Sequence, residues 1–154
     1  MKGFSFPLES IRVLRQQRER AAQQRYSRAM AAADTAERTL QAAGSDLTGG
    51  YRTLEQELKQ GTGSARILHL RTWCTVLESR VKECEAALLQ ARQAAAEALN
   101  FLNAARRDRE TLDRFHDKSW NAWKHFCQQA EQKMLDELAI QRQHSPSLEH
   151  GHLN

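Results

Sequence analysis

Apolar residues recur along the second half of the chain in alternating steps of four and three, which is the seven-residue period of a coiled-coil helix. The positions are Leu70, Cys74, Leu77, Val81, Cys84, Leu88, Ala91, Ala95, Ala98, Leu102, Ala105, Arg109, Leu112, His116, Ser119, Trp123, Phe126 and Ala130. Only Arg109, His116 and Ser119 among them are polar. A stripe of this kind, which we call the seam, keeps one face of a helix against a partner helix. The pattern predicts one very long helix in a coiled coil.

The first half of the chain carries a similar seam. Its regular part is Tyr26, Ala29, Ala33, Ala36, Leu40, Ala43 and Leu47, followed after a shift of one residue by Tyr51, Leu54 and Leu58. The earlier part is less regular and is formed by Leu8, Ile11, Leu14 and Ala22, with Arg18 as an interruption. This half therefore predicts a second long helix.

Glycines between the two seams predict a turn. Gly61 suits the C-terminal cap of one helix, and Ser64 suits the N-cap of the next. The expected elements are a first helix at about 8–60, a turn at 61–64 and a second helix at about 65–143. Gly44, Gly49 and Gly50 are expected to weaken or kink the first helix near its end, and an interruption at 44–50 stays open.

The fold class predicted is all-α, a long antiparallel two-helix coiled-coil hairpin with an overhanging C-terminal helix. Residues 1–143 form its single domain, and the tail at 144–154 is expected to be disordered. A hairpin closed at the glycine turn places the alanine-rich stretch 21–43 opposite 82–104, and small side chains let two helices approach closely. This match favours a monomeric hairpin, although a parallel homodimer also pairs alanine with alanine.

The same register leaves the second helix without a partner from about residue 118 to 143. This overhang is apolar on one side, through Trp120, Trp123, Phe126, Met134, Leu135 and Leu138. We expect Phe4 and Phe6 to fold back over Trp120 and Trp123. The end around Leu135 and Leu138 then still needs a groove or cavity to cover it.

Composition places the chain among cytoplasmic, soluble proteins. Hydrophobic residues make up 40% and aromatic residues only 6%, which suits long helices better than a bulky core. No segment is long and apolar enough for membrane insertion, and the first residues do not resemble a signal peptide. Cys74, Cys84 and Cys127 are too widely spaced for a disulfide framework.

The formal net charge is +4, and the excess lies early in the chain. Six arginines there face few carboxylates: Arg12, Arg15, Arg18, Arg20, Arg25 and Arg28. A basic stripe of this kind suits nucleic acid, an acidic membrane surface or an acidic protein cavity, or is a solvated helix face. Nucleic acid is disfavoured, because no aromatic residues are interleaved and no nucleic-acid-binding module is recognisable.

No pattern in the chain indicates an enzyme, a cofactor or a metal site. The glycine turn lacks the lysine and the preceding strand of a phosphate-binding loop. The carboxylates of the second helix lie on helix faces without a pocket to change their pKa. His150 and His152 are the only histidines with a spacing that suits a metal, and they belong to the tail.

Both ends of the chain resemble the FliJ family, the central stalk of the flagellar type III export ATPase. The start reads Phe4-x-Phe6-x-Leu8 with Ile11 and Arg15, and the end reads Gln132-Lys133-x-x-Asp136-Glu137-x-Ala139. In the middle, Tyr51, the glycine turn and Trp73-x-x-x-Leu77 are similar to the tip of the family's hairpin. Injectisome stalk proteins and the gamma subunit of rotary ATP synthases are similar to this family.

The resemblance implies that the end holding both termini enters an ATPase hexamer, promotes its assembly and stimulates hydrolysis. The ring-binding residues that it implies are Phe4, Phe6, Leu8, Ile11, Arg15, Gln132, Lys133, Leu135, Asp136 and Glu137. It also implies that the hairpin tip contacts the membrane export gate, and that the chain can handle export chaperones. The gate-binding residues are Leu47, Tyr51, Trp73, Leu77, Arg80 and Cys84, of which Leu77 and Cys84 also lie on the seam.

Three hypotheses remain after the sequence analysis. The first is a monomeric stalk at the cytoplasmic face of the inner membrane, in a flagellum or an injectisome, and the phenylalanine-rich start favours the flagellum. The second is a structural coiled-coil scaffold, which predicts a stable homo-oligomer. The third is nucleic-acid binding, which predicts an affinity that falls steeply with salt.

Overall fold

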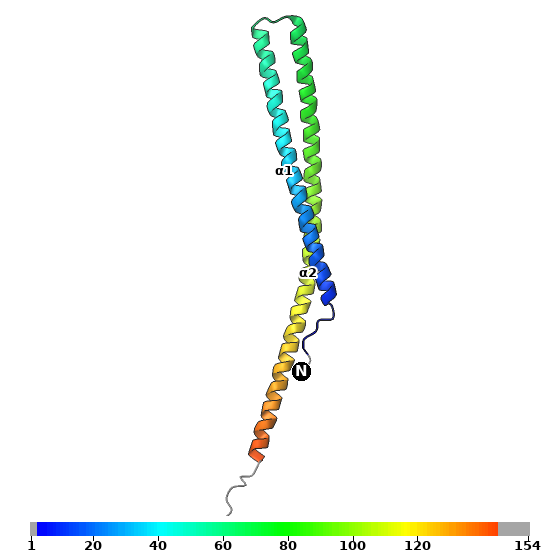
Figure 1. Cartoon of the computed structure of the whole chain (residues 1–154), viewed down its shortest axis with the longest axis vertical. Coiled ribbons are helices and arrows are strands. Elements are labelled where there is room, and N and C mark those ends of the chain that lie inside the picture. Colours follow the sequence, from blue (N-terminus) through cyan, green and yellow to red (C-terminus); the bar gives the residue numbers. More distant parts are fainter. Residues whose placement is uncertain (1–2, 145–154) are drawn as a thin grey trace, which may run out of the picture. The chain divides into compact units, whose positions relative to one another are not determined.

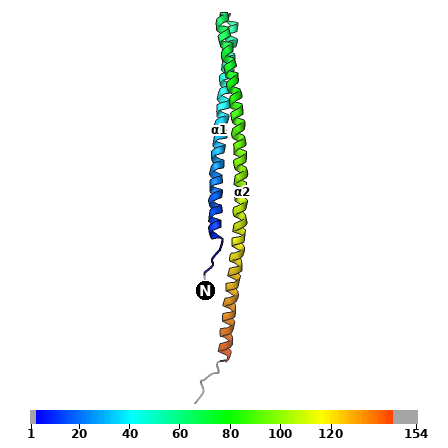
Figure 2. The same ribbon diagram turned by 90° about the vertical axis from the view of Figure 1, so that its right-hand side faces the viewer.

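The computed structural model describes residues 3–144, which form two α-helices and no strand. Helix α1 spans Glu9–Lys59 and helix α2 spans Ser64–His144, with 51 and 81 residues. The two helices run antiparallel beside each other from the turn that joins them (Figures 1 and 2). The predicted all-α helical hairpin is confirmed. The tail expected to be disordered lies outside the described residues, except for His144, which ends α2.

The chain divides into two compact units, and both helices contribute to each. Unit 1 consists of Met1–Val13 and Arg109–Asn154, and unit 2 consists of Leu14–Asp108. No helix among residues 3–144 is long and apolar enough to cross a membrane. Each unit is described below by its own contacts.

Unit 2 is held together by the two seams. Its buried side chains are those of Ala33, Ala43, Cys74, Leu77, Leu88, Ala95, Ala98 and Leu102. Most of them are small, so the helices pack closely without large aromatic residues. Two ion pairs join residues that the predicted register places near each other on facing helices. They are Glu37 with Arg92 and Asp46 with Arg80.

The seam of α1 keeps its period through the glycines instead of shifting by one residue. Gly50 occupies the seam position, whereas Tyr51 and Leu58 are 45% and 57% exposed. The helix is uninterrupted at 44–50. Burial of the seam on both sides of Gly50 stabilises a regular helix, so the weak helix propensity of glycine does not break it.

Gly50 is expected to respond to substitution differently from its neighbour Gly49. A methyl group on Gly50 would lie 2.9 Å from Cδ1 of Leu77 and 3.4 Å from Sγ of Cys74, whereas one on Gly49 would meet nothing within 4 Å. Gly49→Ala should therefore stabilise the protein by about 0.5–1 kcal/mol through helix propensity alone. Gly50→Ala should gain less, because the Leu77 side chain must move. Chemical denaturation of both variants measures the difference, and equal gains would contradict the close approach at Gly50.

The turn between the helices is built by hydrogen bonds at each helix end. Gly61 has a φ of 70°, and the N–H groups of Gly61 and Thr62 donate to the carbonyl oxygens of Leu58 and Glu57, respectively. These are the two bonds of a Schellman motif, so Gly61 caps α1 as predicted. At the start of α2 the carbonyl of Gly63, rather than Ser64, accepts the first helical hydrogen bond from Ile67.

Candidate interaction surfaces

In unit 1 the N-terminal segment packs against α2 through aromatic rings. The ring of Phe4 lies 5.0 Å from that of Trp120 and 5.8 Å from that of Trp123, measured between centroids. Phe6, which is buried, lies edge-on to His116 at 5.1 Å and contacts Phe115 at 5.7 Å. Edge-to-face and tilted pairs at these distances are favourable. The predicted fold-back is thus confirmed for Phe4, whereas Phe6 covers the preceding turn of α2.

Next to this cluster, α1 meets α2 through charged groups. Nε of Arg12 donates to Oδ1 of Asp113 at 2.9 Å, and Nη1 of Arg109 donates to Oδ2 at 2.7 Å. The hydrogen bond from Arg12, followed by the one from Arg109, lowers the pKa of the Asp113 carboxyl. Arg12 therefore takes the seam position that the sequence analysis gave to Ile11, which is 42% exposed.

Beyond Trp123 the apolar side of α2 continues without a described partner. We call Cys127, Ala130, Met134 and Leu138 the terminal stripe, because their spacing of three and four residues places them on one helix face. Cys127 and Ala130 are half-buried, whereas Met134 and Leu138 are 63% and 46% exposed. Phe126, which the sequence analysis placed on the seam, is 67% exposed, and Cys127 takes its place.

The residues proposed for ring binding fall mostly in unit 1. Phe4 and Leu8 are half-buried and Phe6 is buried, but every residue from 131 to 144 is exposed, including Lys133, Leu135 and Glu137. Nε2 of Gln132 donates to Oδ1 of Asp136 at 2.9 Å, which orients both side chains on one face. Arg15 belongs to unit 2 instead, where Nη1 donates to the carbonyl oxygen of Asp108 at 2.7 Å.

The residues proposed for gate binding all lie in unit 2 but differ in exposure. Leu77 is buried in the seam, and Leu47 and Cys84 are half-buried. Trp73 is 51% exposed, and Arg80, seven residues further along the same side of α2, pairs with Asp46 at 3.6 Å.

Tyr51 lies on the other side of the hairpin from this pair. Its hydroxyl donates a hydrogen bond to the Glu78 carboxylate, and this bond raises the pKa of Tyr51. Trp73 and Arg80 therefore lie on one side of the hairpin, two helical turns apart, and Tyr51 lies on the other side.

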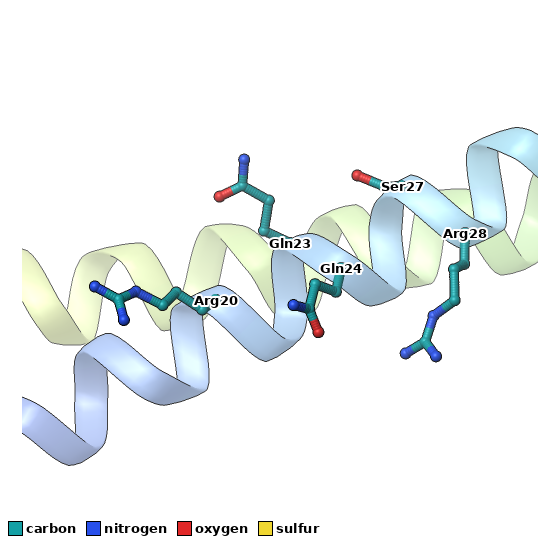
Figure 3. A pocket seen from close by; sticks show the side chains of 5 residues that line it. All are labelled: Arg20, Gln23, Gln24, Ser27 and Arg28. Atoms are coloured by element: carbon teal, nitrogen blue, oxygen red, sulfur yellow. The ribbon is translucent and has the colours of Figure 1, made fainter.

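A polar hollow of about 600 Å³ lies on α1 of unit 2 (Figure 3). Its lining side chains are Arg20, Gln23, Gln24, Ser27 and Arg28, all of them from α1. Figure 3 shows the two guanidinium groups at opposite ends of this group, with the amides and the hydroxyl between them. None of the lining side chains is a carboxylate, so the hollow is basic.

No group of three histidine, cysteine or acidic residues among residues 3–144 is arranged to hold a metal ion. The two histidines whose spacing suits a metal, His150 and His152, lie outside the described residues.

A helical hairpin with an exposed apolar end of one helix fits the stalk architecture that the resemblance to the FliJ family implies. The family model described as "Flagellar FliJ protein" matches residues 4–147. The chain belongs to this family, which is one of flagellar export rather than a known enzyme family. No curated protein and no solved structure matches the chain.

Proposed function

We propose that the chain is the central stalk of a flagellar export ATPase. In this proposal unit 1 enters the hole of the ATPase hexamer, promotes its assembly and stimulates hydrolysis. The hairpin of unit 2 then contacts the membrane export gate at the cytoplasmic face of the inner membrane. Membership of the FliJ family supports the flagellar setting, and the terminal stripe is the observation that carries the stalk role.

The terminal stripe supports insertion into a protein cavity for two reasons. First, Met134 and Leu138 are 63% and 46% exposed, and burying the part of each side chain that still contacts water would contribute about 1–2 kcal/mol. Second, an isolated amphipathic helix binds a partner by laying its apolar face into a groove. The remaining faces carry Lys133, Asp136 and Glu137, which suit a polar cavity wall beside an apolar contact.

The hydrolysis rate of the cognate export ATPase, titrated with the chain, tests this function. The full chain is expected to stimulate hydrolysis, and a version that ends at residue 130 should lose most of that stimulation. The truncation keeps the aromatic cluster of Phe4, Trp120 and Trp123, so the remaining protein should still be helical by circular dichroism. An ATPase that is active alone but responds to neither version would contradict the proposal.

Gate contact is a second part of the proposal, and Trp73 and Arg80 are the residues that support it best. They are exposed on one side of the hairpin about two helical turns apart, and tryptophan and arginine are the residue types enriched in binding hot spots. Leu77 and Cys84, in contrast, pack in the seam between the two helices. The family's link to export chaperones extends the same proposal, although no described contact selects a chaperone-binding surface.

A coiled-coil scaffold is the competing function. It predicts a stable homo-oligomer that persists after truncation at residue 130, whereas the stalk proposal predicts a monomer that joins a partner ring. Sedimentation of the free chain distinguishes the two.

A further inference from the structure

The ion pairs of unit 2 distribute charge unequally between the two helices. Four of them join α1 to α2, and each places the carboxylate on α1 and the guanidinium on α2. The pairs are Glu19 with Arg106, Glu37 with Arg92, Asp46 with Arg80 and Glu57 with Arg66, at 3.2–3.7 Å. Four carboxylates of α1 are thereby neutralised by arginines of the partner helix rather than by the arginines of α1 that point outward.

Four such arginines lie on the outer face of α1: Arg20, Arg28, Arg38 and Arg52. All four are exposed, and none forms an ion pair or a hydrogen bond with another residue of the described chain. At 100° per residue they fall within about a third of the helix circumference, opposite the seam, and they extend over about 48 Å. Two carboxylates lie within that sector between Arg20 and Arg52: that of Asp34 and, at the edge of the sector, that of Asp46, which pairs with Arg80 on α2. We call this surface the basic face.

The basic face lacks the features of a protein-binding surface. The large exposed apolar residues of α1 between Arg20 and Arg52 are Met30 and Tyr51, and both lie toward α2 rather than on this face. Small and polar side chains such as Gln24 and Ser27 separate the arginines (Figure 3). Protein interfaces depend on buried aromatic or aliphatic anchors, and this face offers none.

The spacing of the arginines also decides between anionic partners. Successive arginines of the basic face are separated by about 12, 15 and 21 Å along the helix. These unequal distances do not match the regularly spaced phosphates of a nucleic-acid duplex. The lipids of a fluid bilayer diffuse laterally, and an anionic headgroup can therefore move under each guanidinium whatever the spacing.

We propose that the basic face adsorbs the hairpin to the surface of a membrane containing anionic phospholipids, without insertion. Each basic residue near such a surface strengthens binding about fivefold, and the attraction extends over about one Debye length. The proposal concerns unit 2 alone and does not require the ATPase, so it can fail or succeed independently of the stalk function.

Flotation of the full chain with lipid vesicles tests the proposal. Vesicles that contain about one third phosphatidylglycerol should bind the chain at low salt, whereas pure phosphatidylcholine vesicles should not, and about 0.5 M salt should release it. The variant R20Q/R28Q/R38Q/R52Q should lose at least tenfold in partitioning. Its helicity should be unchanged, because none of the four side chains contacts another element.

A second variant with the same loss of charge provides the matched control. R71Q/K82Q/R114Q/K118Q removes four exposed cations from α2, none of which has a described partner. Its partitioning should change by less than about threefold, because these side chains are not on the basic face.

Three results would overturn the proposal. Equal losses in the two variants would show that net charge alone, and not the basic face, drives binding. No binding to the anionic vesicles at low salt would exclude membrane adsorption. Tighter binding of duplex DNA than of vesicles, lost in the α1 variant, would assign the face to nucleic acid instead.

Discussion

Replacing Leu88 by alanine is expected to lower the free energy of unfolding by about 2–4 kcal/mol. The Leu88 side chain is 7% exposed on the seam of α2, and its neighbour Leu89 is 60% exposed on the outer side. Removing the buried side chain forfeits its transfer free energy and leaves a gap between the two helices. The thin hairpin has no second layer of side chains to fill that gap.

Leu89→Ala is the matched control, because it changes the same residue type one position further along the same helix. Its effect should stay within about 0.5 kcal/mol, since alanine has the higher helix propensity and little apolar area is lost. Urea denaturation followed by circular dichroism measures both variants. Similar losses of stability in the two variants would contradict the packing of Leu88, rather than Leu89, against α1. A larger loss for Leu89→Ala would mean that α1 packs against the side of α2 that carries Leu89.

The seam of α2 could be predicted from the sequence because apolar residues occupy almost all of its positions. From Cys74 to Trp123 every predicted position is buried or half-buried, and the other half-buried residues in that range are Glu78, Ala104 and Asp113. The prediction was wrong at Phe126, where hydrophobicity alone suggested the seam. The seven-residue phase continues there through Cys127, and no described residue of α1 reaches that part of the helix to bury a phenylalanine.

The start of the α1 seam could not be predicted from hydrophobicity, because charged residues occupy it. Arg12 pairs with Asp113 in unit 1, and Glu19 pairs with Arg106 in unit 2. A half-buried ion pair with good geometry is tolerated at a helix interface, and it displaces apolar residues such as Ile11 to the surface. Opposite charges at facing positions of the hairpin register were the signal available in the sequence.

The exposure of the candidate surface residues could be predicted only in part, since it depends on where the partner helix lies. The resemblance to the FliJ family groups Tyr51, Trp73 and Leu77 as one surface, but the hairpin buries Leu77 and places Tyr51 and Trp73 on different sides. The basic face likewise depended on which carboxylates the arginines of α2 neutralise. An early excess of arginine was evident, but which of these residues remain unpaired was not.

Replacing Leu138 by glutamate is expected to weaken stimulation of the export ATPase at least tenfold, as measured by the concentration of chain needed for half-maximal stimulation. Leu138 belongs to the terminal stripe, and the proposed function buries that stripe against the ring. A carboxylate placed in an apolar contact must be desolvated without a partner, and this costs several kcal/mol.

Ile140→Glu is the matched control for this experiment. Ile140 is 55% exposed, close to the 46% of Leu138, but at 100° per residue it lies about 200° around the helix from it. Both substitutions add one negative charge to the same turn of an exposed helix, so the net charge changes equally, and circular dichroism checks the helicity of each variant. Ile140→Glu should alter the half-maximal concentration by less than about threefold, because its side chain projects away from the terminal stripe. Equal losses would indicate that charge near the end of α2, rather than an apolar face, determines stimulation, and no loss from either variant would remove residues 131–144 from the proposed contact.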